Sequence, residues 1–143
     1  MLKQISSPSL LLVGVKTKRM NAIINLGKYL FAIPFAIFGI MHFMNADAMA
    51  GMAPFGGAIM IYITGAALVA AAVSIIIGKM DKLASVLLAL MLLIFALSIH
   101  LPGVMSGDEA QMMNSMPNLL KDTMLAGGAL MYASMAKDNA VIG

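Results

Sequence analysis

Four ionisable side chains fall inside or beside long apolar stretches of this sequence: His42, His100, Lys121 and Asp122. Ionisable groups are costly at membrane depth, so they are candidates for function wherever they occur there. An imidazole exchanges protons near neutral pH, and a carboxylate such as that of Asp122 can orient or neutralise it. These residue types could therefore form an outer polar pocket that binds a small molecule, for which a quinone has suitable chemistry.

Two other interpretations of these four residues remain open. All of them lie near the ends of apolar stretches, where headgroups and water can solvate an ionised group, so they could be interfacial anchors without a ligand. The two histidines could instead hold a metal or haem, although no ligand-spacing motif supports this. We therefore assign no metal ligand and no catalytic residue, and we expect the chain not to be catalytic on its own.

The elements that carry these side chains are strongly apolar. The 143 residues are 62% hydrophobic and 10% charged, whereas soluble domains carry about 25% charged residues. So few charges cannot cover a water-exposed surface, and lipid is the expected solvent. A transmembrane helix needs about 20 apolar residues. The segments that meet or approach this length are 23–44, 54–77, 83–101 and 119–136.

The expected fold is all-α, an integral membrane four-helix bundle with both termini inside. The long apolar runs show no strict alternation, which favours helices over barrel strands. Lys and Arg are enriched in inner loops, and an N-in arrangement leaves only Lys121 outside. The inside then holds eight basic residues: Lys3, Lys16, Lys18, Arg19, Lys28, Lys79, Lys82 and Lys137.

This topology fits a multi-pass protein of the bacterial inner (plasma) membrane, with the lipid bilayer as its first partner. The net charge of +3 is spread between the apolar runs, so we do not expect nucleic-acid binding. The sequence contains no cysteine, which excludes disulfides and thiol chemistry within the chain.

Small residues predict where the helices touch, because lipid-embedded helices associate through close packing. Within the second apolar segment such residues recur every four positions, and the fourth segment carries a glycine pair. The predicted packing residues are Ala66, Ala70, Ser74, Gly78, Gly127 and Gly128.

The register of the fourth segment separates its two charged neighbours. Asp122 lies four residues before Ala126 and seven before Ala129, so it shares their small-residue face and should point inward. Lys121 is rotated by about 100° from Asp122, and we expect it to extend towards the headgroups.

The outer loop predicts a short helix of its own. Pro102-Gly103 should end the third segment, and Ser106 with Glu109 has the spacing of a capping box. Pro117 should end the run, which gives a short interfacial helix on the outer surface. Its methionines could bind Cu(I), but clustered methionines more often provide flexible apolar contacts: Met105, Met112, Met113 and Met116.

The expected domain organisation is simple. Residues 1–21 form a disordered cytoplasmic tail, or lie upstream of a true start at Met20. Residues 22–137 form the membrane domain, and residues 138–143 form a cytoplasmic C-terminal tail.

Three stretches of the sequence resemble the DoxX-like family of small four-helix bacterial membrane proteins. They are Phe35 to Phe43 (FAIFGIMHF), Leu97 to Leu101 (LSIHL), and Leu119 to Leu130 (LLKDTMLAGGAL). The resemblance covers about residues 25–136. Some members of that family are linked to redox systems, including the small membrane subunit of a thiosulfate:quinone oxidoreductase.

The resemblance implies an accessory or anchoring membrane subunit of a quinone-linked redox system. Such a subunit would contact a redox partner protein, or form a homo-oligomer, and could contact quinone. Fold does not fix function, so a small-solute transporter or channel, or a purely structural membrane partner, remains the alternative.

Overall fold

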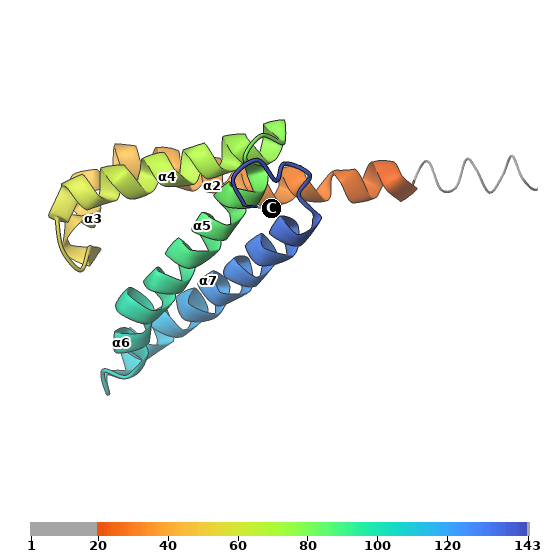
Figure 1. Ribbon diagram of the computed structural model, residues 1–143. Helices are drawn as coiled ribbons and strands as arrows, with labels where there is room; N and C mark the ends of the chain where they lie inside the picture. Colours follow the sequence, from red (N-terminus) through yellow and green to blue (C-terminus); the bar gives the residue numbers. More distant parts are fainter. Residues whose placement is uncertain (1–19, 143) are drawn as a thin grey trace, which may run out of the picture.

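The computed structural model describes residues 20–142, so expectations about residues 1–19 lie outside the described part (Figure 1). Residues 20–142 are mostly helical and contain no strand. Residues 20–25 form the first helical stretch. The elements that follow are α2 (Gly27–Met44), α3 (Ala46–Met49), the 3-10 turn η1 (Ala50–Met52), α4 (Gly57–Ile77), α5 (Asp81–Phe95), the π-helical turn η2 (Ala96–His100), α6 (Leu101–Val104) and α7 (Glu109–Met135).

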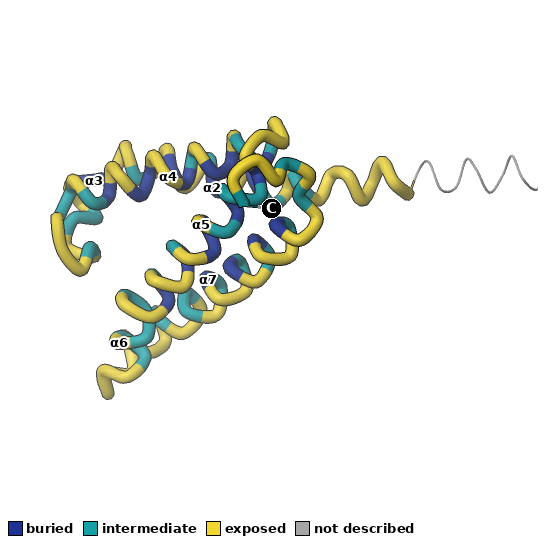
Figure 2. The backbone as a smooth tube through the Cα atoms, in the orientation of Figure 1, coloured by how far each residue is buried: buried dark blue, intermediate teal, exposed yellow. Residues whose placement is uncertain are grey.

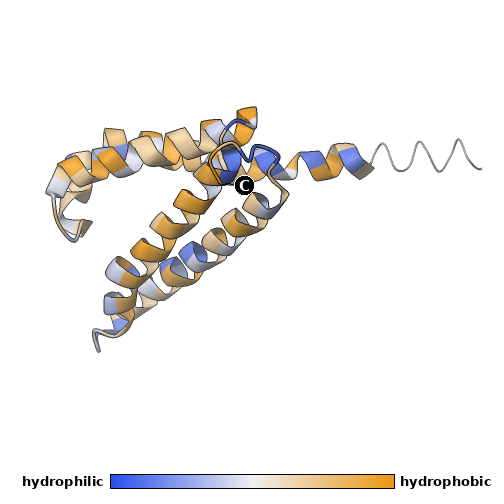
Figure 3. Ribbon diagram, in the orientation of Figure 1, coloured by the Kyte–Doolittle hydropathy of each residue, from blue (hydrophilic) through white to orange (hydrophobic). Residues whose placement is uncertain are grey.

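Three helical stretches are long and apolar enough to cross a membrane: Met20–Met44, Gly57–Ile77 and Asp81–Val104. The described chain is therefore that of a membrane protein by length and composition. The fourth predicted segment, 119–136, lies within α7, whose first turns carry polar residues such as Gln111 and Asn114. Figure 3 shows the difference in hydropathy: hydrophobic residues (orange) predominate along α4 and α5, whereas α7 also carries hydrophilic residues (blue).

The helices form two pairs that meet at one end and diverge towards the other (Figure 1). α2 packs along α4, and α5 packs along α7, whereas α4 and α5 share fewer contacts. A tight turn between Ile77 and Asp81 joins the pairs, and it needs left-handed backbone at Gly78 (φ 70°) and Met80 (φ 52°). Glycine adopts that conformation without steric cost, so Gly78 permits the sharp reversal.

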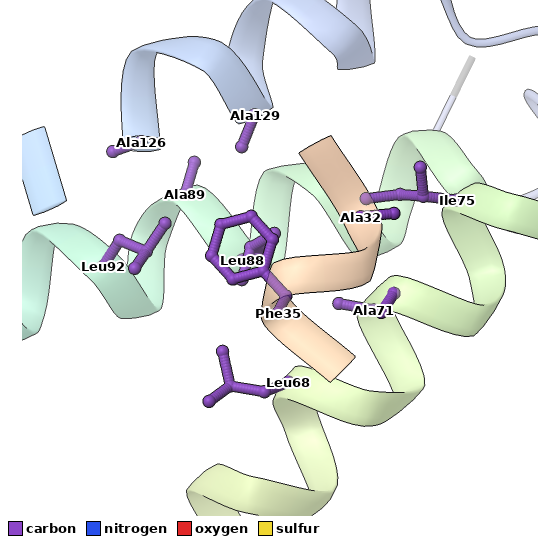
Figure 4. Close-up of a cluster of buried hydrophobic side chains, with 11 residues drawn as sticks. Ala32, Phe35, Leu68, Ala71, Ile75, Leu88, Ala89, Leu92, Ala126 and Ala129 are labelled. Atoms are coloured by element: carbon purple, nitrogen blue, oxygen red, sulfur yellow. The ribbon is translucent and has the colours of Figure 1, made fainter. Parts of the chain in front are cut away.

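A buried cluster holds the two pairs together where they meet (Figure 4). The cluster combines small and large side chains. Figure 2 shows that the buried positions lie on the sides of the helices that face one another. All four long helices contribute: Ala32, Phe35, Leu68, Ala71, Ala72, Ile75, Leu88, Ala89, Leu92, Ala126 and Ala129. In lipid this cluster stabilises the fold by close packing rather than by removal of apolar surface from water.

α2 and α4 approach each other closely at two glycines. A Cβ atom added to Gly39 would lie 2.7 Å from the carbonyl oxygen of Gly65, and one added to Gly65 would lie 2.9 Å from that of Gly39. Each glycine therefore leaves room for the other's backbone, as small residues do at membrane helix contacts.

The predicted packing ladder lies mostly off the buried face of α4. Ala66, Ala70 and Gly78 are exposed and Ser74 is half-buried, while the buried face of α4 carries Gly65, Leu68, Ala72 and Ile75 among others. The reason is geometric: α4 meets α2 through Gly65, and the ladder begins one residue later, about 100° around the helix.

The two glycines of α7 differ in their contacts. A Cβ at Gly128 would lie 3.1 Å from Phe31 Cε2, so Gly128 packs closely against α2 as expected, whereas a Cβ at Gly127 would meet nothing within 4 Å. The buried face of α7 also carries Ala126, Ala129 and Ala133.

This geometry gives a first prediction. Ala70→Leu is expected to change the free energy of unfolding by no more than about 0.5 kcal/mol, as substitutions at exposed sites usually do. The matched variant Ala72→Leu alters a residue with 0% exposure and should destabilise by about 1–3 kcal/mol through overpacking. Unfolding of both variants in detergent checks this, and a larger loss for Ala70→Leu than for Ala72→Leu would contradict the observed face.

Two sequence expectations, for the C-terminal end of the third apolar segment and for the start of α7, are wrong. α6 continues the helical path through Pro102 and Gly103, because proline is tolerated in the first turn of a helix. No separate interfacial helix forms within the described residues: α7 runs without a break from Glu109 through Pro117. Its N-cap is Asp108, which accepts a hydrogen bond from the backbone N–H of Gln111 at 2.9 Å.

Ser106, the expected N-cap, is bound one turn earlier. Its hydroxyl donates to the carbonyl oxygen of Gly103 at 2.8 Å and accepts from the backbone N–H of Asp108 at 3.2 Å. It therefore stabilises the corner before α7, and Asp108 caps the helix.

Polar contacts of the C-terminal segment stabilise the end of the helices at the turn between α4 and α5. Asp138 accepts a 2.6 Å hydrogen bond from the backbone N–H of Met80, and Lys82 donates to Asn139 Oδ1 at 3.1 Å. The backbone N–H groups of Met80 and Ala140 lower the pKa of the Asp138 carboxyl, so it accepts these bonds in its ionised form.

Candidate functional site

A cavity of about 280 Å³ lies between the two helix pairs, on the side where they diverge. Its walls are largely apolar, and every long helix contributes to them. Beside the four candidate residues, the lining comprises Phe35, Phe38, Met49, Met52, Ala53, Pro54, Met60, Ile61, Thr64, Leu68, Leu92, Phe95, Ile99, Asn118 and Leu125. The structure thus places His42, His100, Lys121 and Asp122 on the wall of one cavity.

The centre of the polar wall is a close contact between the His100 imidazole and the Asp122 carboxylate. His100 Nε2 lies 3.1 Å from Asp122 Oδ2, and the two side chains are only 15% and 7% exposed. Asp122 faces inward as its register with Ala126 and Ala129 predicts. Because the pair joins η2 to α7, it fixes the orientation of the His100 ring.

Lys121 sits at the more open side of this wall. Its Nζ lies 3.4 Å from Asp122 Oδ1, with 42% of the side chain exposed, and it donates to Asn118 Oδ1 at 3.2 Å. The same ammonium lies 5.5 Å from the ring centroid of Phe38 on α2. Lys121 thus spans the cavity between the helix pairs, rather than only extending towards headgroups as the sequence led us to expect.

His42 lies on the opposite wall, in the last turn of α2. Its Nδ1 is 2.7 Å from the carbonyl oxygen of Phe38. A carbonyl oxygen can only accept a hydrogen bond, so Nδ1 carries the proton. This contact holds the imidazole ring against α2 and leaves Nε2 as the nitrogen that can meet a ligand.

A π-helical turn presents His100 to the cavity. Residues Ala96–His100 form η2, between α5 and α6. A π-turn inserts an extra residue into the helical repeat, and such turns are frequent at functional sites. The resulting rotation lets Ile99 and His100 both line the cavity. No feature of the sequence that we could identify predicted this turn.

Sequence reasoning also missed two polar lining residues and one wall. Asn118 lies three residues before Lys121, a spacing that places both on one helix face and could have indicated their contact. Thr64 is buried at 8% exposure on α4, but a single threonine in an apolar run gives no such signal. The wall formed by Met49 and Met52 comes from α3 and η1, which lie between the first two predicted apolar segments.

The site is better suited to an organic ligand than to a metal. Among residues 20–142 no group of three or more His, Cys, Asp and Glu side chains could hold a metal ion. His100 uses Nε2 for Asp122 and His42 uses Nδ1 for a backbone carbonyl. The arrangement instead offers hydrogen bonds at one end of an apolar space.

No protein-family model, curated protein or solved structure matches this chain, so the functional argument rests on the geometry of this site.

Proposed function

We propose that this chain is an integral membrane protein that binds a lipid-soluble ligand with hydrogen-bonding oxygens, a member of the quinone class, in the outer polar pocket. The observation that carries the proposal is the His100–Asp122 pair, which lies almost buried on the wall of an otherwise apolar cavity. Pockets for small molecules combine apolar walls with a few placed polar groups.

The dimensions of the cavity fit the head of such a ligand. A volume of about 280 Å³ lies just below the roughly 300–1,000 Å³ of typical ligand pockets, which suits the head of a ligand rather than the whole of it. An aromatic head group can therefore be enclosed against Phe35 and Phe95, while an apolar tail would leave between the diverging helix pairs. When bound, a quinone supplies two-electron redox chemistry. The chain's own residues bind and orient it, and His100 with Asp122 can hold or release a proton at the imidazole.

As a biological role we propose an accessory or anchoring subunit of a quinone-linked redox system, of the DoxX-like kind. Support comes from the sequence resemblance together with the cavity, which lies at the residues that carry the resemblance: Phe38, His42, His100, Lys121 and Asp122. The electron-transferring partner would then be another protein at the same membrane.

We further propose a four-helix membrane domain in the bacterial inner membrane, with α7 as the fourth span and both termini inside. Lysines gather around the turn between α4 and α5: Lys28 donates to the carbonyl oxygen of Ile76 at 3.2 Å, and Lys82 contacts Asn139. Positive charge marks the cytoplasmic side, and the cavity lies towards the other end of the helices.

The topology gives a second prediction. Reporter domains fused after Met44 and after Gly107 are expected to read outside, and a reporter fused after Met80 is expected to read inside, because lysine-rich ends stay cytoplasmic. Alkaline phosphatase and green fluorescent protein fusions measure this in cells. A cytoplasmic signal at Gly107 would show that α7 does not return across the membrane.

Ligand binding to the purified protein in nanodiscs tests the proposed function. A short-tailed benzoquinone should raise the unfolding temperature, measured by loss of helical circular dichroism, since a ligand at 100 times its Kd stabilises by about 2.7 kcal/mol. An alkylbenzene with the same tail and no oxygens is the matched control ligand. Equal shifts with both compounds would show a merely lipophilic cavity and would overturn the proposal.

A matched pair of variants sharpens this test. His100→Gln removes the imidazole contact with Asp122 and should reduce the quinone-induced shift. Asp47→Asn alters an exposed carboxylate on α3 that does not line the cavity, and it should leave the shift unchanged. An unaltered shift in His100→Gln would place the ligand elsewhere.

A further inference from the structure

The hydrogen-bonding state of His42 restricts what the cavity can bind. Nδ1 donates to the carbonyl oxygen of Phe38, so in the neutral ring Nε2 is an acceptor with a free lone pair. Within residues 20–142 no hydrogen-bond partner of Nε2 is present, and His42 lines the cavity. A ligand that meets Nε2 must therefore bring a donor.

Lys121 lines the same cavity and requires the opposite hydrogen-bonding partner. An ammonium has three donors and no acceptor, so a ligand atom that meets Lys121 must accept. Each of the two side chains contacts Phe38: His42 Nδ1 donates to its backbone carbonyl oxygen, and Lys121 Nζ lies 5.5 Å from the centroid of its ring. Both side chains line the same cavity.

A hydroxyl group satisfies both demands at once, because its O–H donates while its lone pairs accept. A carbonyl oxygen can accept from Lys121 but has nothing to donate to His42. Binding sites that are built to hydrogen-bond a hydroxyl discriminate strongly against analogues that lack it, since a desolvated polar atom of the site is then left unpaired.

We propose that the pocket selects the hydroxyl-bearing, reduced form of its ligand, with His42 Nε2 accepting from the hydroxyl and Lys121 donating to the same oxygen. This inference rests on the proposed function and names the ligand class more narrowly, as an alkylated hydroquinone or phenol. In a quinone-linked system the chain would then hold the reduced carrier. His42 is the specificity-determining residue and takes part in no bond breaking.

Three ligands with one tail separate the outcomes: an alkyl-hydroquinone, its dimethyl ether, and the corresponding quinone, all compared anaerobically on protein in nanodiscs. The hydroquinone should bind at least about tenfold more tightly than either other compound, as the loss of one hydrogen bond between ligand and site would cause. Equal affinities for all three would overturn the inference while leaving the proposed function intact. No binding of any of them would overturn the proposed function itself.

A variant of His42 tests whether this residue causes the preference for the hydroquinone. His42→Phe keeps an aromatic ring and removes the acceptor, so hydroquinone and dimethyl ether should bind equally well to it. Retention of the full preference in this variant would overturn the inference. The control Asp47→Asn should keep the wild-type preference.

A measurement on the unaltered protein covers the case in which His42→Phe does not fold. Nitrogen-15 NMR of histidine-labelled protein in nanodiscs reports which ring nitrogen carries the proton, with His100→Gln used to assign the two signals. We expect the Nε2 signal of His42 to be that of an unprotonated nitrogen and to shift when the hydroquinone is added. A protonated Nε2, or a signal insensitive to the hydroquinone, would overturn the inference.

Discussion

Gly65→Leu is expected to separate α2 from α4 and to lower the free energy of unfolding by at least about 1–3 kcal/mol, the usual cost of overpacking. Even a single added carbon at Gly65 would lie 2.9 Å from the carbonyl oxygen of Gly39 and 2.9 Å from His42 Cβ. The first of these atoms is backbone, which cannot rotate away, so the helices must move apart.

The matched control for this variant is Gly127→Leu. Gly127 also lies within a helix, but an added Cβ would meet nothing within 4 Å, so the same substitution should have little effect on stability. Unfolding in detergent, followed by circular dichroism, compares the two variants. Similar stabilities for both would mean that α2 and α4 do not cross at the two glycines. Because the added side chain also presses on His42, Gly65→Leu should weaken ligand binding.

The helices themselves were predictable because the signal is local and strong. Each of the first three apolar runs is long enough to cross a membrane on its own, and each coincides for the most part with one of the helices that meet this criterion. The short polar turn around Gly78 and the break at Asn45 were also visible as interruptions of apolar sequence.

The packing faces were less predictable, since helix contacts depend on which small residues face each other across two helices. The ladder through Ala66 and Ala70 was the most regular pattern in the sequence, yet the contact forms at Gly65 because α2 offers Gly39 at the matching height. A pattern on one helix cannot reveal its partner. The start of α7 was missed for a different reason: Pro117 was expected to end a separate short helix, whereas it lies inside α7.

For the candidate site, the residue types and their shared depth were readable from the sequence. So was the inward direction of Asp122, because helical register is fixed by counting from Ala126 and Ala129. The π-turn that carries His100 and the proton position on His42 were not, since both follow from backbone geometry that only the folded chain displays.

Asp122→Asn is expected to destabilise the protein and to weaken ligand binding. Asp122 is 5% exposed and its carboxylate faces both His100 and Lys121. Hydrogen bonds to charged groups contribute about 1.5–3 kcal/mol each. The contact with Lys121 is discounted because that side chain is 42% exposed and solvent screens it. We therefore expect a loss of about 2 kcal/mol, which comes mainly from the contact with His100.

The comparison of Asp122→Asn with three other variants separates a pocket from interfacial anchoring. Asp122 does not need to touch the ligand to matter, because it orients His100; it is a positioning residue, and His100→Gln should weaken binding to a similar extent. Lys121→Gln should lower stability less, since its side chain is more exposed. Asp47→Asn, on an exposed site of α3, should have a free energy of unfolding within about 0.5 kcal/mol of wild type.

Interfacial anchors would instead give small and similar effects in all four variants. Equilibrium unfolding and quinone-induced thermal shifts on the same preparations measure both quantities, and a uniform set of small effects would decide for anchoring.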